Sequence, residues 1–254
     1  ASQNCTQILD NGGHALALRV MHTHRRDDRV VSAACFALAN LVAHEDAARA
    51  LLERRDHCLH SVLQAMNNHS FNQGVCEAGC RAIRNAAIHE PGRRLILSLG
   101  GVAVIIRAMA QHSAKQPVCG YGCSALHLLA QDDTDAAAIL QLGGLQSVIK
   151  ALRTHPAGVG VAKGSSGLLQ ALARNTRVRA EIVELGGLEA LVAAGHRHVG
   201  NDRVLQEMCG ALNALVADRR AHRSGAACAV VALVMRVRNH VGASGTLIAL
   251  TDET

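Results

Sequence analysis

Aromatic residues are nearly missing from this chain of 254 residues, which has no Trp, one Tyr and two Phe. A hydrophobic core must therefore be built from Ala, Leu, Val, Ile and Cys. That composition suits closely packed helices better than a β-sandwich, where aromatic and β-branched residues are favoured. Only three prolines occur, and each falls where we expect a turn between helices or the start of a helix. Both scarcities favour an all-α fold.

Long hydrophobic runs are also missing. The longest uncharged apolar run, Ala226 to Met235, is far short of the ~20 residues of a transmembrane helix, so we expect no membrane insertion. The nine cysteines are an odd number in a chain too long for a small disulfide scaffold. This favours a reducing compartment, hence an intracellular location, cytoplasmic or nuclear. The net charge of +6 comes almost entirely from Arg and favours acidic partners modestly.

The chain does contain a repeat. Six histidines recur with successive gaps of 45, 43, 43, 43 and 42 residues: His24, His69, His112, His155, His198 and His240. A diglycine keeps the same spacing at 12–13, 100–101, 143–144 and 186–187. A period in this range is typical of a solenoid, in which stacked repeats offer a long surface.

Three helical segments are expected in each repeat. A short apolar helix precedes the diglycine, whose glycine is a typical C-cap, and a second helix runs from it to the periodic His. The third helix has the clearest register, since apolar or small residues recur three positions before and after a core Leu or Ile and form a buried stripe. We expect third helices near 28–43, 73–88, 117–131, 159–174 and 202–217.

This three-helix unit resembles the armadillo repeat. Glu184-Leu185-Gly186-Gly187-Leu188 matches the junction between the family's first two helices, and Ala37-Leu38-Ala39-Asn40-Leu41 matches its third-helix motif. The resemblance implies an all-α, right-handed superhelical solenoid of three-helix repeats, with about five full repeats and partial end repeats in one domain over 1–254. A HEAT array is the nearest alternative, but its repeats normally have two helices and lack the diglycine.

The resemblance also implies a non-catalytic scaffold that binds proteins or extended peptides along a concave groove of third helices, and the basic net charge favours acidic ones. In the family an Asn there bonds the backbone of a bound peptide. Asn40 and Asn85 occupy this position, which Leu128, Ala171 and Ala214 fill in later repeats. The absence of Trp argues against a receptor for nuclear-localisation signals. The residues expected to line the groove are Phe36, Asn40, Arg81, Arg84, Asn85, Ser124, His127, Gln170 and Asn213.

No cofactor, metal or catalytic residue is expected. Equivalent histidines in adjacent repeats lie ~8–10 Å apart, too far to share a zinc, so we interpret them as caps on the second helices. The pairs Cys76/Cys80 and Cys119/Cys123 fit a packed core better than a zinc site. The segment 158–164 is interpreted as a helix-start turn, because it lacks the spacing of a phosphate-binding loop.

Two other functions stay open. Apolar ends of the array would suit a structural segment of a large assembly, or of a longer array, with end-to-end packing against other chains. The Arg25-Arg26-Arg29 and Arg219-Arg220-His222-Arg223 clusters could meet nucleic-acid phosphates. We favour that function less, because single-strand binding usually adds aromatic stacking platforms.

Overall fold

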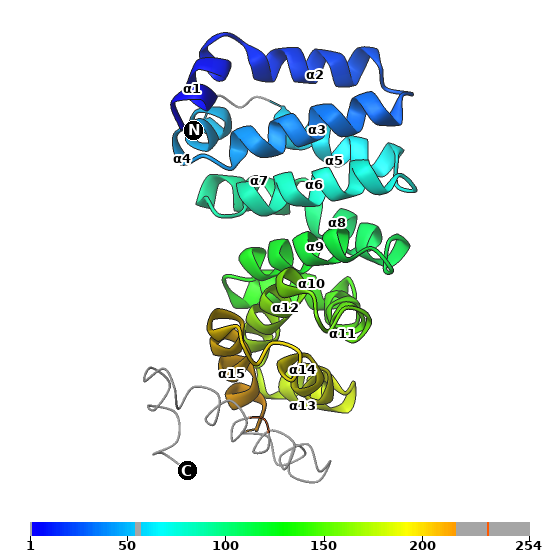
Figure 1. Cartoon of the computed structure of the whole chain (residues 1–254), viewed down its shortest axis with the longest axis vertical. Coiled ribbons are helices and arrows are strands. Elements are labelled where there is room, and N and C mark those ends of the chain that lie inside the picture. The colour runs from blue at the N-terminus through cyan, green and yellow to red at the C-terminus, as the bar shows by residue number, and fades with distance from the viewer. Residues whose placement is uncertain (1, 54–56, 217–232, 234–254) are drawn as a thin grey trace.

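The computed structural model describes residues 2–53, 57–216 and 233, and over these residues the chain is all-helical. Fifteen helices form five consecutive triplets that stack along one axis (Figure 1). The all-α solenoid expected from the sequence is thus confirmed. Of the residues singled out in the sequence, His240 and the cluster Arg219-Arg220-His222-Arg223 lie outside the described residues.

Each triplet contributes one helix to each of three series. The first helices are α1 (Ser2–Asp10), α4 (Glu45–Glu53), α7 (Glu90–Ser98), α10 (Asp133–Gln141) and α13 (Thr176–Glu184). The second helices are α2 (Gly13–Thr23), α5 (Cys58–Asn68), α8 (Gly101–Gln111), α11 (Gly144–Thr154) and α14 (Gly187–Gly195). The third helices are α3 (Asp28–Val42), α6 (Gln73–Ala86), α9 (Gln116–Leu129), α12 (Val159–Leu172) and α15 (Asp202–Val216). The five predicted third helices are therefore present.

The diglycine sets the corner between the first two helices. Its first glycine has a positive φ, 71° at Gly100 and 79° at Gly143, which strains any other residue. Its second glycine is the first residue of the next helix and packs closely against the preceding turn. A β-carbon on Gly101 would lie 2.9 Å from the Ile96 carbonyl oxygen. Both glycines are thus required, one for the backbone angle and one for the close approach.

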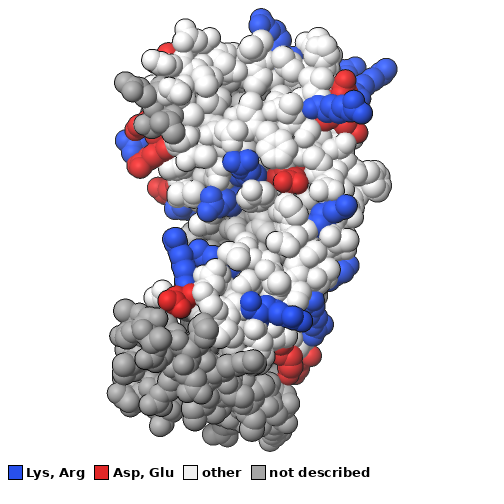
Figure 2. Space-filling model, viewed as in Figure 1, with Lys and Arg blue, Asp and Glu red and all other residues white. Residues whose placement is uncertain are grey.

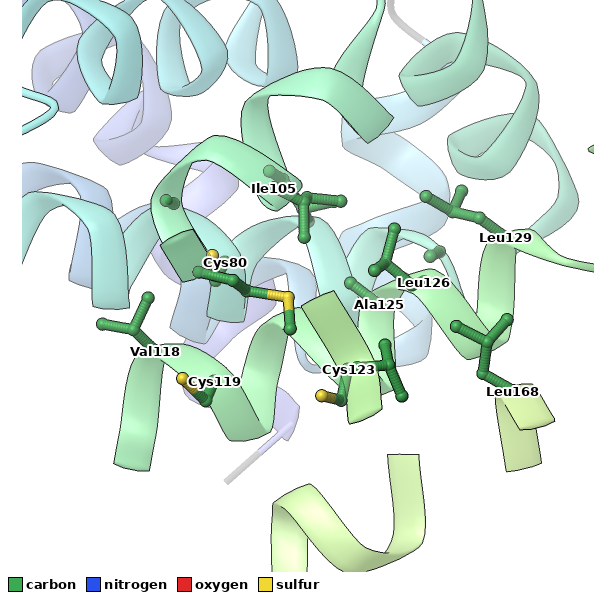
Figure 3. Packing of buried hydrophobic residues seen from close by; sticks show 14 of the residues in the cluster. Cys80, Ile105, Val118, Cys119, Cys123, Ala125, Leu126, Leu129 and Leu168 are labelled. Carbon is green, nitrogen blue, oxygen red and sulfur yellow. The ribbon is translucent and has the colours of Figure 1, made fainter. Parts of the chain in front are cut away.

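The core runs unbroken through the stack. Third helices pack on one another in series, and second helices do the same (Figure 1). The core Leu or Ile of each third helix is at most 2% exposed. Figure 3 shows Cys80 of α6, Ile105 of α8, Cys123 of α9 and Leu168 of α12, which come from three successive repeats and belong to one core without an aromatic ring among the labelled residues. One expected stripe position differs, since Cys209 on α15 is only partly buried.

Within the described residues no single helix is long and apolar enough to cross a membrane. Two bent pairs, α3 with α4 and α7 with α8, reach that length and composition only when joined.

Candidate protein-interaction surface

The residues expected to line the groove come from all five third helices, which lie side by side along the stack (Figure 1). We call the surface that carries them the third-helix face. Its members are Phe36 and Asn40 on α3, Arg81, Arg84 and Asn85 on α6, Ser124 and His127 on α9, Gln170 on α12 and Asn213 on α15. The structure brings the first five into one cluster across α3 and α6, whereas the other four are spread over three helices.

Arg81 is held by two groups of the preceding repeat. Its Nη2 donates to the Asn40 Oδ1 over 2.9 Å, and its guanidinium lies 6.0 Å from the centre of the Phe36 ring, a cation–π distance. Both partners are neutral, so the side chain is positioned while its charge stays uncompensated. Glu77, one turn earlier on α6, makes no ion pair with it in the described part of the chain.

Arg84 and Asn85 form a second link between the same helices. Asn85 is 4% exposed, and its Nδ2 donates to the Ala39 carbonyl over 2.9 Å. Its Oδ1 accepts from the Arg84 Nη1, also at 2.9 Å. The Asn85 amide is therefore engaged on both sides within the protein, unlike the exposed Asn40. The two asparagines that occupy one position of the repeat have different surroundings.

The later repeats present a flatter face. The His127 imidazole lies over Gly167, where a β-carbon would come within 2.6 Å of its Cε1. Gln170 lies over Gly210 in the same way, and a β-carbon at Gly210 would lie 2.9 Å from the Gln170 Nε2. Burial lowers the pKa of His127, which favours a neutral imidazole. Ser124 is partly buried, and Asn213 is exposed.

Two of the periodic histidines join neighbouring repeats by a bond from the imidazole to a carbonyl. The His112 Nε2 donates to the Ser70 carbonyl over 2.8 Å, and the His155 Nε2 donates to the Ser113 carbonyl over 2.8 Å. A carbonyl oxygen only accepts, so Nε2 carries the proton in both rings. The prediction that the His caps its own helix holds for the backbone N–H of His24, His69, His112 and His155, as His112 N bonds the Ala108 carbonyl, but not for His198, since the C-cap of α14 is His196. For the side chain it was wrong, because the imidazole reaches the preceding repeat.

The first repeat boundary departs from this pattern. The His69 Nδ1 lies 2.5 Å from the Asp28 Oδ1, and the Asn72 Nδ2 donates to the Asp28 Oδ2 over 3.0 Å. His69 therefore bonds a side chain of α3 instead of a carbonyl in the preceding turn. Sequence reasoning missed Asp28, although aligning the repeats places it where the next two carry Gln73 and Gln116.

The cysteines of the third helices behave as core residues. Cys76 directs its thiol to the Ser70 carbonyl at 3.4 Å, and Cys119 directs its thiol to the Ser113 carbonyl at 3.6 Å. These carbonyls also accept from the histidines of the next repeat. Burial raises the pKa of Cys76 and Cys119 to about 11 and that of Cys123 to about 12. Over the described residues no group of three His, Cys, Asp or Glu could hold a metal ion.

These raised pKa values predict slow thiol chemistry in the folded protein. With the folded pKa above the usual value, Cys76, Cys119 and Cys123 stay protonated at pH 8, and the thiolate is the reactive species. We expect iodoacetamide at pH 8 to modify these three residues at least about tenfold more slowly than in guanidinium-unfolded protein. Peptide mass mapping of timed samples measures this residue by residue. Equal rates in the folded and unfolded states would contradict the prediction.

Positive and negative side chains are interspersed on the face of the molecule that Figure 2 shows. Figure 2 shows Lys and Arg in several separate groups with Asp and Glu between them, not one continuous basic stripe. The described ion pairs are few and local: Arg49 with Glu45, Arg94 with Glu90, and His69 with Asp28. Many arginines are therefore available to meet an external anion.

Comparison with known proteins agrees with this architecture. The LRRK2 ARM repeat family matches residues 13–163, more than half of the chain. A designed armadillo repeat protein superposes with a TM-score of 0.69 at 18% identity, over 85% of this chain and 87% of that one. Two engineered proteins have TM-scores of 0.68 and 0.70 at 23% and 20% identity, over 85% and 86% of this chain and 85% and 87% of theirs. No curated protein sequence matches the chain.

The structural likenesses show the fold, and the family match adds a sequence relationship. Armadillo repeats generally serve as protein-interaction scaffolds and are typically non-enzymatic. With five stacked three-helix units, a positive-φ glycine at four of their corners and a family match from residue 13 to residue 163, the chain belongs to the LRRK2 ARM repeat family of armadillo proteins.

Proposed function

We propose that this armadillo scaffold binds extended, acidic segments of partner proteins along the third-helix face, with Arg81 and Arg84 as the main contacts. The observation that carries the proposal is the way in which these two guanidinium groups are held. Each bonds a neutral amide oxygen, Asn40 Oδ1 for Arg81 and Asn85 Oδ1 for Arg84, both at 2.9 Å. Their orientation is restricted while their charge stays free for a carboxylate.

Preorganisation of this kind favours binding. An arginine that is already oriented loses less side-chain entropy when it meets a partner, and its planar fork matches a carboxylate in two parallel bonds. Five N–H donors are present on each guanidinium, and neutral partners occupy only part of them. Two such groups on one helix, three positions apart, could engage carboxylates on successive exposed positions of an extended chain.

The remaining residues of the third-helix face would have lesser roles. Ser124, His127, Gln170 and Asn213 continue the face toward the later repeats, and Phe36 and Asn40 hold Arg81. Asn85, with its amide engaged on both sides, would position Arg84 and not bond a peptide directly. In this proposal most of the affinity comes from contacts at α3 and α6. The later repeats, with Ser124, His127, Gln170 and Asn213, add contacts that select among partners.

The test uses a displayed library of random 16-residue peptides selected on the whole chain. We expect the enriched peptides to be rich in Asp and Glu. The double variant Arg81→Glu/Arg84→Glu should bind these peptides at least about tenfold more weakly, because each peptide carboxylate then faces a like charge. The matched control is Arg107→Glu/Lys150→Glu, which makes the same charge change at exposed positions of α8 and α11. Enriched peptides without acidic residues, or equal losses in both variants, would contradict the proposal.

A further inference from the structure

A cavity lies between the second helices α2 and α5, away from the third-helix face. Its volume is about 440 Å³, within the range of ~300–1,000 Å³ that is usual for ligand pockets. Leu18, Met21 and Ala65 contribute apolar walls, and His22, Arg25 and Gln64 stand around its edge. Arg25, His22 and Gln64 are exposed. Val31 adds to the apolar walls, and Ser61, Asn68 and His69 add polar groups, so a partly apolar cavity with a basic edge is present at this boundary.

The next boundary shows why the cavity exists. Between α5 and α8, the Arg107 Nη1 donates to the Asn67 Oδ1 over 3.1 Å, and the His112 imidazole bonds the Ser70 carbonyl. At the α2–α5 boundary the positions of Asn67 and Arg107 hold His22 and Gln64, between which no hydrogen bond is formed in the described structure. The equivalent histidine, His69, turns to Asp28. Both bridges that close the next boundary are therefore replaced here.

The charged side chain that lines the cavity is a cation. Arg25 lines it, and Arg26 follows in the same turn. The two acidic residues that come next in the chain are already engaged: Asp27 accepts the backbone N–H groups of Arg29 and Val30, and Asp28 binds His69 and Asn72. No Asp or Glu is among the residues that line the cavity. An anionic group at its edge would thus meet a cation without displacing an internal ion pair.

We propose that the α2–α5 cavity is a second binding site, separate from the third-helix face, for a partner segment in which an acidic residue follows an aliphatic side chain. The aliphatic group enters between Leu18, Met21 and Ala65, and the carboxylate meets Arg25. Burial of the aliphatic carbons supplies affinity in proportion to the apolar area covered. The guanidinium selects the acidic neighbour through a charge-assisted hydrogen bond. The cavity is lined by α2, α5, the turns that follow them and Val31 of α3, and by no residue of the third-helix face, so a partner can occupy it while that face is filled.

The probe is the blocked tetrapeptide acetyl-Gly-Leu-Glu-Gly-amide, titrated into the uniformly ¹⁵N-labelled whole chain. We expect amide shifts concentrated on α2, α5 and the turn between α2 and α3. Replacing Glu with Gln, or Leu with Ala, in the peptide should weaken binding at least about fivefold, through loss of the charge-assisted bond or of buried carbons. Shifts spread over other helices, or equal affinity for all three peptides, would overturn the proposal.

Variants of the protein make the test specific. Arg25→Glu should weaken binding of the probe about tenfold. Arg26→Glu makes an equal charge change in the same turn, but Arg26 does not line the cavity, so this variant should bind the probe nearly as well as the wild type. Gln64→Trp should block the cavity at an exposed position without changing charge. Equal losses from Arg25→Glu and Arg26→Glu would overturn the proposal, as would Arg25-dependent binding of a dT12 oligonucleotide that displaces the probe. Arg81→Glu/Arg84→Glu should leave the probe bound, which separates this site from the third-helix face.

Discussion

Replacing Gly164 with Ala should lower the free energy of unfolding by about 2 kcal/mol, although alanine is the better helix former. Gly164 lies inside α12, where that helix approaches the backbone of α9. A β-carbon there would lie 2.7 Å from the Cys123 carbonyl carbon and would also clash with the Ser124 N. Both atoms belong to the backbone of α9, which cannot move aside as a flexible side chain can. The two helices must therefore separate, and the contacts around them weaken.

The matched control is Gly120→Ala on the facing helix α9. A β-carbon at Gly120 would lie 3.5 Å from the nearest atom, the Val161 N, which is an ordinary van der Waals contact. This substitution should be neutral or stabilise by up to about 1 kcal/mol, through helix propensity alone. Urea unfolding followed by circular dichroism compares both variants with the wild type. If Gly164→Ala were as stable as Gly120→Ala, the close approach of α9 and α12 would be contradicted.

Replacing Asn85 with Ala should cost about 2 kcal/mol of stability. The Asn85 Nδ2 donates to the Ala39 carbonyl, which lies in the last turn of α3. The N–H of Ala43 that could bond this carbonyl instead goes to the Asn40 and Leu41 carbonyls. Asn85 thus satisfies one of the open acceptors at the end of the neighbouring helix. Its removal leaves that acceptor buried without a partner and releases Arg84.

Asn40→Ala is the comparison, because Asn40 occupies the same position of the preceding repeat but is exposed. Its loss should change stability by less than about 0.5 kcal/mol. Urea midpoints and hydrogen exchange at α3 measure the difference between the variants. A large loss for Asn40→Ala with none for Asn85→Ala would reverse these assignments. Equal, small losses would mean that the bond to Ala39 contributes little.

The helices were predictable because their signals are local. The core Leu or Ile and its neighbours three positions away indicate a buried stripe wherever the chain folds, and the third helices begin within one residue of the expected positions. Their ends were set up to two residues too late. Ala87 and Ala130 continue the apolar pattern beyond α6 and α9, yet they are buried in the following turns. An apolar residue in the pattern therefore indicates that its position is buried, but not that the position is helical.

The surface was less predictable, because its contacts join residues about one repeat apart. The bonds from Asn85 to Ala39 and from His112 to Ser70 depend on the placement of two repeats, which no local pattern records. The sequence therefore placed Asn40 and Asn85 in one class, and only the structure separates them. The cavity between α2 and α5 depends likewise on Asp28, which lies where the next two repeats carry Gln73 and Gln116.

The imidazole bonds also give the array a direction of easy bending. They all lie at the edge where second helices turn into third helices, and each crosses one repeat boundary. A bend that parts the turns at the α5–α8 or α8–α11 boundary must break one of these hydrogen bonds, whereas a bend that presses the turns together need not. At the α2–α5 boundary the bonds from His69 and Asn72 to Asp28 oppose the same opening, but at the α11–α14 boundary the His198 Nε2 has no hydrogen-bond partner among the described residues. Changes in curvature that accommodate partners of different lengths should therefore start between the last two described repeats.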